Sequence, residues 1–254
     1  MAEIAKESGH WYTPAGDPAY EVPYADPKKG MRPTTLRDAK KLGLIPSVTT
    51  IMKESNKPGL NVWLIDQAIM AALTLNREEN EPDASYLARV KKDAAEHGKK
   101  AAEKGTHIHG VIERGLSALD VEDEDLPYVM LAKTALDEAC PDKRWSHEKS
   151  FARERYAGKV DLHDIDSPTV IDIKTNEKPV ADAKLWDDHL MQLAAYGHGL
   201  YQETEFLQAG ILFINHKDME AKIVWATTEQ LEKGWEMFVA LTNYFYAKKQ
   251  LRRG

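Results

Sequence analysis

The amino-acid sequence predicts an α/β protein in which a mixed central β-sheet follows a helical region. Two observations lead to this fold class. The stretch of residues 84–119 is rich in Ala, Lys and Glu, which favour helix. From residue 145 onward, short extended runs separated by turn residues alternate with helical segments. The resulting order of helix, three strands, helix, two strands and helix is that of an α/β layout.

The chain divides into three parts by composition. Residues 1–46 are rich in proline with scattered aromatic residues, and we expect them to form an extended, loosely structured arm. Residues 47–100 form the predicted helical region, and residues 101–254 the predicted core domain. The expected helices cover residues 48–52, 60–77, 83–119, 128–139, 186–202 and 229–250, and the expected strands cover residues 145–153, 158–165, 169–175, 206–215 and 221–226.

Bulk properties exclude several classes of protein. No stretch approaches the roughly 18 uninterrupted apolar residues of a membrane span, and the first residues lack a signal-peptide pattern, so we expect a cytoplasmic protein. Cys140 is the single cysteine, which excludes an internal disulfide and a four-cysteine iron–sulfur cluster within this chain. The net charge of −7 argues against a general nucleic-acid coat protein, although a local basic stripe still suffices to hold a strand.

Two carboxylates and a lysine fall on neighbouring predicted strands. In the run Val170-Ile171-Asp172-Ile173-Lys174, alternation places Asp172 and Lys174 on one face. Asp161 follows Gly158-Lys159-Val160 on the preceding strand, one hairpin away. Asp-x-Lys occurs by chance in many proteins, where it is an ordinary exposed pair. Buried like charges, however, need compensation, and a divalent cation with oxygen ligands supplies it.

Two helices carry further polar residues at helical spacing. Gly105, His109 and Glu113 stand at i, i+4 and i+8 on one stripe of the long helix. Glycine inside a helix costs about 1 kcal/mol, so Gly105, next to His109, predicts that some other group approaches the helix closely there. Gln192 and Tyr196 stand four residues apart on the helix after the Asp-x-Lys strand, a spacing that is common on exposed faces.

Together these pieces resemble the RecB-like branch of the PD-(D/E)xK nuclease superfamily. They occur in that family's order over about residues 105–200, and the later strands and helix fit the same core. Residues 46–49, followed by a helical region, resemble the corresponding segment of one subgroup. That subgroup contains the mitochondrial genome maintenance exonuclease and related phage and bacterial exonucleases. Iron–sulfur members of the branch need four cysteines and are excluded as close relatives. The matching motifs are Gly105-x-x-x-His109-x-x-x-Glu113, Gly158-Lys159-Val160-Asp161, Asp172-Ile173-Lys174 and Gln192-x-x-x-Tyr196.

The resemblance implies a metal-dependent phosphodiesterase acting on DNA. His109, Asp161 and Asp172, with the backbone carbonyl of Ile173, would bind one or two Mg²⁺ or Mn²⁺ ions. Lys174 would orient the attacking water or offset charge on the phosphate. Supporting or substrate-binding roles fall to Gln192, Tyr196, Glu113 and Glu148.

The helical region provides candidate contacts to the DNA strand. Lys99, Lys100 and Lys104 lie one to three turns before His109 and are candidates for phosphate contacts, the alternative being a solvated helix face. The region around Ser47 and Trp63 is a candidate arch over a single strand, with bases stacking on aromatic rings.

The preferred interpretation is a DNA exonuclease favouring single-stranded or free ends. Its setting would be replication, recombination or repair in a bacterial or phage-infected cell, without membrane association and with any protein partner unknown. The first alternative is a structure-specific or flap endonuclease of the same fold. Others are a catalytically inactive DNA-binding protein and a metal-stabilised structural protein.

Overall fold

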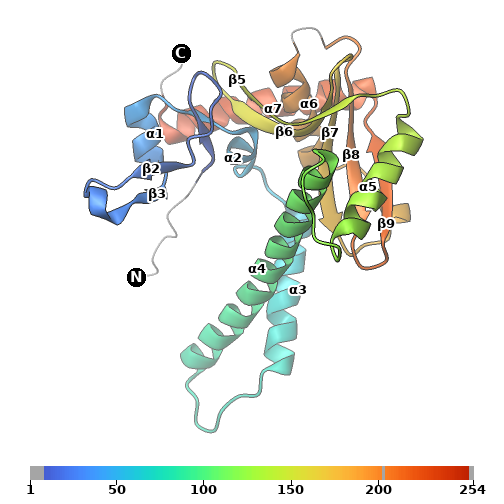
Figure 1. The fold of residues 1–254 in the computed structure, drawn as a ribbon. Helices are drawn as coiled ribbons and strands as arrows, with labels where there is room; N and C mark the ends of the chain where they lie inside the picture. The colour runs from blue at the N-terminus through green and yellow to red at the C-terminus, as the bar shows by residue number, and fades with distance from the viewer. Residues whose placement is uncertain (1–8, 202–203, 252–254) are drawn as a thin grey trace.

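The computed structural model describes residues 9–201 and 204–251, and its centre is a five-stranded mixed sheet (Figure 1). Strands follow one another in chain order, and only β7 and β8 pair in parallel. Parallel neighbours need a crossover connection, which contains helix α6 (Asp187–Leu200). The strands are β5 (Trp145–Ala152), β6 (Ala157–Asp164), β7 (Thr169–Asn176), β8 (Gln208–Asn215) and β9 (Glu220–Trp225).

Helices cover both faces of this sheet, so the predicted α/β layout with a mixed central sheet is confirmed. Helices α2, α6 and α7 pack on one face, and α5 with the C-terminal part of α4 packs on the other. The predicted helices and strands of residues 47–250 are all present, with boundaries shifted by a few residues; the predicted end of one helix at residue 202 lies outside the described residues. The remaining bounds are α2 (Val48–Met52), α3 (Pro58–Thr74), α4 (Asp83–Leu116), α5 (Leu126–Ala139) and α7 (Thr228–Lys249).

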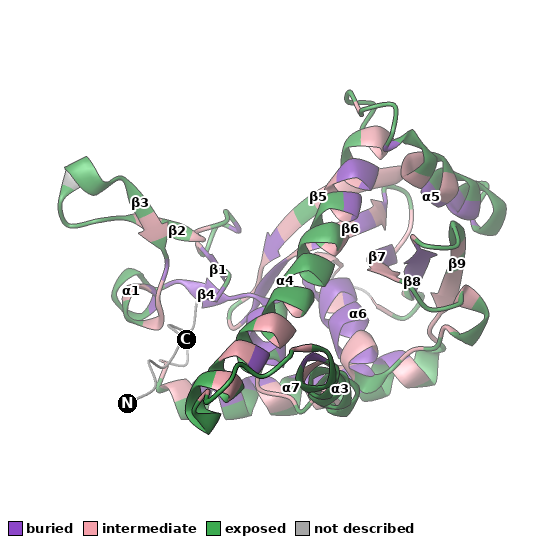
Figure 2. Ribbon diagram, turned by 90° about the horizontal axis from the view of Figure 1, so that it is seen from below, coloured by how far each residue is buried: buried purple, intermediate pink, exposed green. Residues whose placement is uncertain are grey.

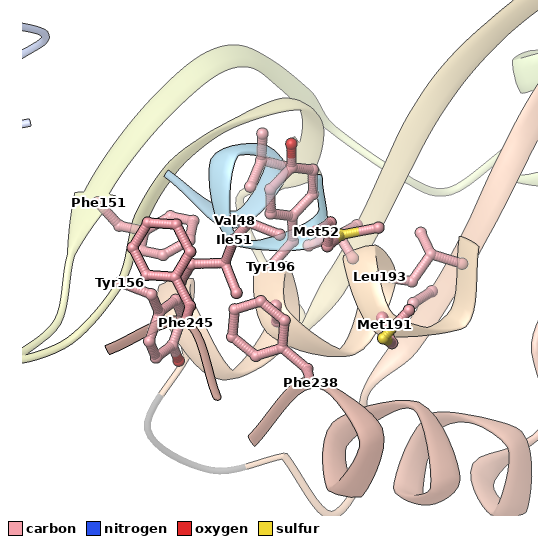
Figure 3. Close-up of a cluster of buried hydrophobic side chains, with 14 of the residues drawn as sticks. Val48, Ile51, Met52, Phe151, Tyr156, Met191, Leu193, Tyr196, Phe238 and Phe245 are labelled. Atoms are coloured by element: carbon pink, nitrogen blue, oxygen red, sulfur yellow. The ribbon is translucent and has the colours of Figure 1, made fainter. Parts of the chain in front are cut away.

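Strand β7 is apolar on both faces, which explains its central position. Val170 belongs to the cluster under α6 and α7, whereas Ile171 and Ile173 belong to the cluster under α4 and α5. Figure 3 shows the first cluster, in which Tyr196 and Phe238 lie among aliphatic side chains from α2 and α6. A strand buried on both sides is rich in β-branched residues, and in residues 169–173 Asp172 is the one residue that is not β-branched.

The N-terminal arm is more regular than the sequence analysis expects. Short strands β1 (Trp11–Tyr12) and β4 (Ile45–Pro46) pair with each other, as do β2 (Glu21–Pro23) and β3 (Met31–Pro33). A 3₁₀ turn at Pro27–Lys29 and helix α1 (Leu36–Leu42) complete the arm.

Helix α1 has clear local signals at both of its ends. Thr35 and Asp38 form a reciprocal capping box at its start, and Gly43 ends it in a left-handed conformation, with φ at 64°. The expectation of a loosely structured arm is therefore wrong for this segment, because favourable capping outweighs the proline-rich composition around it. Residues 1–8 lie outside the described part of the chain.

Helices α3 and α4 form an antiparallel hairpin that projects from the body of the molecule (Figure 1). Most of α3 and of the N-terminal half of α4 is exposed (Figure 2), and Ala71 is the buried residue of α3. Only the C-terminal third of α4 reaches the sheet, where Ile108 and Ile112 are fully buried. The hairpin thus brings the C-terminal end of a long exposed helix onto the face of the sheet at β7. In the described part of the chain, no helix meets the length and apolarity that a bilayer crossing requires.

Candidate active site

Strands β6 and β7 separate at Asp161, and the site lies in the gap. Their register pairs are Leu162 with Ile171 and His163 with Val170. Beyond them the Ile173 N–H donates a 2.8 Å hydrogen bond to the Asp161 Oδ2 instead of to a backbone carbonyl. The side-chain carboxylate therefore takes the place of a ladder partner. This split exposes polar groups that would otherwise be covered by a continuous sheet.

Helix α4 carries His109 to this gap. The imidazole Nε2 lies 3.5 Å from the Asp161 Oδ1. One turn earlier, a Cβ on Gly105 would lie 3.1 Å from the Thr175 Oγ1 at the end of β7. The prediction that Gly105 marks a close approach is confirmed, and the approaching residue is Thr175. This contact sets how near α4 comes to β7, and so where His109 stands.

Glu148 enters the same gap from β5 with an unusual backbone conformation. Its φ of 54° lies in the left-handed region, which costs energy for a residue with a side chain. The residues on either side of Glu148 keep their register with β6, while Glu148 and Asp161 form no ladder pair. The Glu148 carboxylate also forms an ion pair with Lys159. A strained residue facing two functional candidates marks this position as part of the site.

The donor atoms of His109, Glu148 and Asp161 fit a divalent cation. One ligand atom from each lies within 4.8 Å of the others. Among the described residues, this is the cluster of His, Cys, Asp or Glu side chains that is close enough to hold a metal ion. Two carboxylates and one imidazole suit Mg²⁺ or Mn²⁺, with the nitrogen favouring Mn²⁺. Glu148, a supporting residue in the sequence analysis, is thus placed among the metal-ligand candidates.

Asp172 lies beside this group and is held by two other side chains. It is 2% exposed; the Gln192 Nε2 donates a 2.7 Å hydrogen bond to its Oδ1, and the Lys174 Nζ lies 2.7 Å from its Oδ2. Lys174 also donates to the Gln192 Oε1 at 3.2 Å, and Gln192 donates to the Tyr196 hydroxyl at 2.9 Å. The helical Gln192–Tyr196 pair therefore faces the buried carboxylate and not solvent.

Burial and like charge control protonation in the site. Burial, with the charge of Asp172, raises the pKa of Asp161 to about 8. Burial lowers the pKa of His109, which leaves a neutral imidazole able to bind a metal. Burial also opposes the charge on Lys174, but the Asp172 carboxylate outweighs it and raises the pKa of the lysine. A cation near Asp161 would relieve the repulsion between the two aspartates.

An open cleft of about 670 Å³ contains this arrangement, which we call the active-site cleft. Residues from α4, β5, β6 and β7 line this cleft together. The residues predicted from sequence that line it are Ser47, His109, Glu113, Glu148, Asp161, Ile173, Lys174 and Tyr196.

Four charged or aromatic residues of the cleft were not proposed as site residues from the sequence. Lys159 has a signal, since it lies within the Gly158–Asp161 motif. His10, Tyr12 and Tyr20 come from the arm; the His10 and Tyr20 rings stack with centroids 4.6 Å apart, and no local pattern predicts their position. Ser47 lines the cleft, and its hydroxyl accepts a hydrogen bond from the Thr50 N–H as the N-terminal cap of α2.

Four predicted contacts lie away from the cleft. Trp63 is 36% exposed and lies on α3 against Gly98 of α4. Lys99 is exposed and pairs with Glu103 at 3.5 Å, and Lys100 and Lys104 are exposed on the same helix. None of the four lines the active-site cleft. Contact between them and a substrate would take place along the projecting hairpin.

Comparisons with known proteins identify no family for this chain. No family model matches the chain, and no curated protein matches it. Among solved structures, the crystal structure of SSO0001 matches 72% of this chain and 86% of its own chain, at 14% sequence identity and a TM-score of 0.34. A similarity at that level supports no conclusion about fold family or function.

Proposed function

We propose that this protein is a metal-dependent deoxyribonuclease with a PD-(D/E)xK core, and that it acts as an exonuclease on single-stranded DNA ends. One observation carries the proposal: a metal-ligand group (His109, Glu148 and Asp161) shares an open cleft with Lys174, whose ammonium is fixed by Asp172. Two carboxylates, a neutral imidazole and a positioned lysine are the components that phosphodiester hydrolysis uses.

His109, Glu148 and Asp161 would hold Mg²⁺ or Mn²⁺ in the gap between β6 and β7. When bound, the ion supplies Lewis acidity to the phosphate and lowers the pKa of a coordinated water. Asp161 gives only one oxygen to this task, because its Oδ2 already accepts from Ile173. The protein thereby fixes that carboxylate before any ion arrives.

Lys174 would stabilise the charge that develops on the phosphate oxygens. Its side chain is partly buried, so its field is stronger than that of an exposed lysine. Asp172 and Gln192 hold the ammonium from one side. In this arrangement Asp172 positions Lys174, in addition to the metal-ligand role that the family resemblance implies.

A preference for ends is supported by the resemblance and by the walls of the cleft. His10 and Tyr20 of the arm line the cleft together with residues of α4. Aromatic rings of this kind suit unpaired bases, which have free faces for stacking. The alternative, a flap or structure-specific endonuclease, uses the same chemistry and differs in the substrates that it cuts.

Cleavage assays on three substrates test the proposal. End-labelled single-stranded DNA, end-labelled duplex and a covalently closed single-stranded circle are incubated with Mg²⁺, Mn²⁺ or EDTA. We expect shortening of the linear single strand in the metals, an intact circle, and no reaction in EDTA. A cut circle would favour the endonuclease, and DNA binding without cutting would favour an inactive DNA-binding protein.

Matched variants link the activity to the site. Asp172→Asn and Lys174→Ala should lower cleavage at least about 100-fold, the size of effect seen when one transition-state donor is removed. The controls are Asp137→Asn and Lys133→Ala, an exposed pair on α5 with the same 2.7 Å separation. Equal activity in both sets of variants would show that cutting does not come from this cleft.

A further inference from the structure

A second cleft adjoins the active-site cleft at Lys174. Its volume is about 710 Å³, and it is formed by the end of β7, the segment before α6, the first turn of α6 and Phe213 of β8. We call it the adjacent cleft. Lys174 and Thr175 line both clefts, so the two hollows meet at the proposed point of cleavage.

The adjacent cleft carries cations without acidic partners. Among the described residues, neither Lys178 nor Lys184 has an ion-pair partner. Instead, the Lys184 Nζ lies 4.2 Å from the centroid of the Trp186 ring. Asp182 is the acidic residue that lines the same cleft, so the two exposed lysines outnumber it. A cleft with this balance attracts phosphate groups.

Aromatic rings lie next to these lysines. Trp186 is 57% exposed, although its large apolar ring favours burial. His189 and Phe213 line the same cleft and contact each other edge to face, with ring centroids 5.7 Å apart. Exposed aromatic rings interleaved with lysines are the composition of surfaces that bind single-stranded nucleic acid, where bases stack and phosphates pair.

A third cleft borders the adjacent cleft at Trp186. Its volume is about 600 Å³, it lies between the start of α3 and the start of α6, and it shares Trp186 and His189 with the adjacent cleft. Asp187 and Asp188 line it together with Lys57, which pairs with Asp188 at 3.4 Å. The excess of lysine over acidic residues therefore belongs to the adjacent cleft, between Lys174 and Trp186.

We propose that the adjacent cleft is a subsite for the DNA strand on one side of the scissile phosphate, in which a base stacks on Trp186 and phosphates contact Lys178 and Lys184. This inference rests on the proposed function, since it places the scissile phosphate at Lys174. It makes Trp186 a positioning residue for the substrate, outside the metal-ligand group.

A binding experiment in the Asp172→Asn background tests the subsite without cleavage. The probe is a short single strand with the fluorescent base aminopurine at one position at a time. We expect strong quenching at one or two adjacent positions, and Trp186→Ala should abolish it and weaken binding about tenfold. Trp186→Phe, which keeps a stacking ring, should retain most of both. The control Phe206→Ala removes a more exposed aromatic ring, 77% exposed, outside all three clefts.

Salt dependence tests the lysines separately. The double variant Lys178→Ala with Lys184→Ala should lower the slope of log affinity against log salt by about 1.4, since each lost contact to a single strand contributes about 0.7. The exposed pair Lys40 and Lys41 on α1 gives the matched double-alanine control. Unchanged slope and unchanged quenching would overturn the subsite.

Cleavage by wild-type protein is measured alongside binding by the variants, so that failure of the subsite can be told from failure of the proposed nuclease activity. If wild-type protein cuts DNA while the Trp186 and lysine variants bind it normally, the subsite is wrong and the nuclease stands. If wild-type protein cuts nothing but Trp186→Ala loses quenching, the adjacent cleft binds single-stranded DNA, and both the nuclease and the placement of a scissile phosphate at Lys174 are wrong. If neither cutting nor binding is seen, both are wrong.

Discussion

The Asp161 Oδ2 accepts a hydrogen bond from the Ile173 N–H at 2.8 Å, across a sheet that has come apart at that point. The other oxygen of the same carboxylate, Oδ1, faces His109 at 3.5 Å. One aspartate thus repairs the backbone pairing between β6 and β7 and also lines the cleft. Because the two oxygens have different partners, the structural and chemical roles of Asp161 can be separated by substitution.

Two substitutions at Asp161 separate these roles. Asparagine keeps an oxygen acceptor for the Ile173 N–H, and alanine removes it. Both variants lose the carboxylate charge, so their difference in stability isolates the hydrogen bond. We expect the free energy of unfolding of Asp161→Asn to be about 1–3 kcal/mol higher than that of Asp161→Ala. This difference is the cost of leaving a buried donor, the Ile173 N–H, without an acceptor. Urea unfolding measures this, and equal stability would contradict the bridging role.

Protonation of Asp161 predicts a pH dependence of stability in the absence of divalent ions. Burial, with the charge of Asp172, raises its pKa from 3.8 to about 8, so the folded protein holds a proton that the unfolded chain releases. The contribution of this group to stability is therefore present at low pH and is lost as pH rises through that interval. Urea unfolding of wild type and Asp161→Asn across the interval should show the decline only in wild type.

Metal binding should release protons in the same pH interval. A cation at Asp161 favours the ionised carboxylate, so binding displaces the proton that burial retains. We expect Mn²⁺ affinity to rise with pH up to about 8, the pKa of Asp161. Titration calorimetry in two buffers of different ionisation enthalpy counts the protons. Identical heats in both buffers, at a pH below that value, would argue against Asp161 as a ligand.

Glu148 and Glu113 form a matched pair for testing the metal-ligand group. Both line the active-site cleft, but only Glu148 belongs to the three-residue group. Glu148→Gln should weaken Mn²⁺ binding roughly 10- to 100-fold, at least the effect of losing a ligand-supporting contact. Glu113→Gln should have a smaller effect. If calorimetry showed that Glu113→Gln weakens Mn²⁺ binding more than Glu148→Gln does, the metal would lie nearer to Glu113 of α4.

Gly105 predicts a coupling between helix placement and metal binding. In Gly105→Ala the new methyl group meets the Thr175 Oγ1 at 3.1 Å, which pushes α4 away from β7. Helix propensity improves by about 1 kcal/mol at the same time, so we expect little net change in stability but weaker Mn²⁺ binding through His109. Adding Thr175→Ala should restore affinity. A double-mutant cycle with no coupling would show that this contact does not position the helix.

Local patterns in the sequence predict the elements well where periodicity is strong. The β-branched run around Asp172 indicates a central strand, and the sheet order confirms it. Alternation places Asp172 and Lys174 on one face, and the ion pair between them confirms that. The helical spacing of Gln192 and Tyr196 indicates a shared face as well. Helix α1 could also have been predicted, since Thr35, Asp38 and Gly43 carry its capping signals. The high proline content of residues 1–46 led instead to the prediction of an extended arm.

Glu148 and the arm residues of the cleft could not have been predicted in the same way. The left-handed backbone of Glu148 depends on how β5 accommodates the split beside it, and strand periodicity contains no sign of this. His10 reaches the cleft because β1 pairs with β4, a contact between segments more than thirty residues apart. Long-range pairing of this kind has no local signature.

The sequence by itself determined the order of helices and strands and the faces on which Asp172, Lys174, Gln192 and Tyr196 lie, because periodicity is a property of neighbouring residues. Only the tertiary structure decided that β6 and β7 part at Asp161, that Glu148 joins His109 there, and that a lysine-lined cleft continues past Lys174 to Trp186. These features arise from packing between distant segments, where the balance of burial, charge and backbone pairing is set by the whole fold.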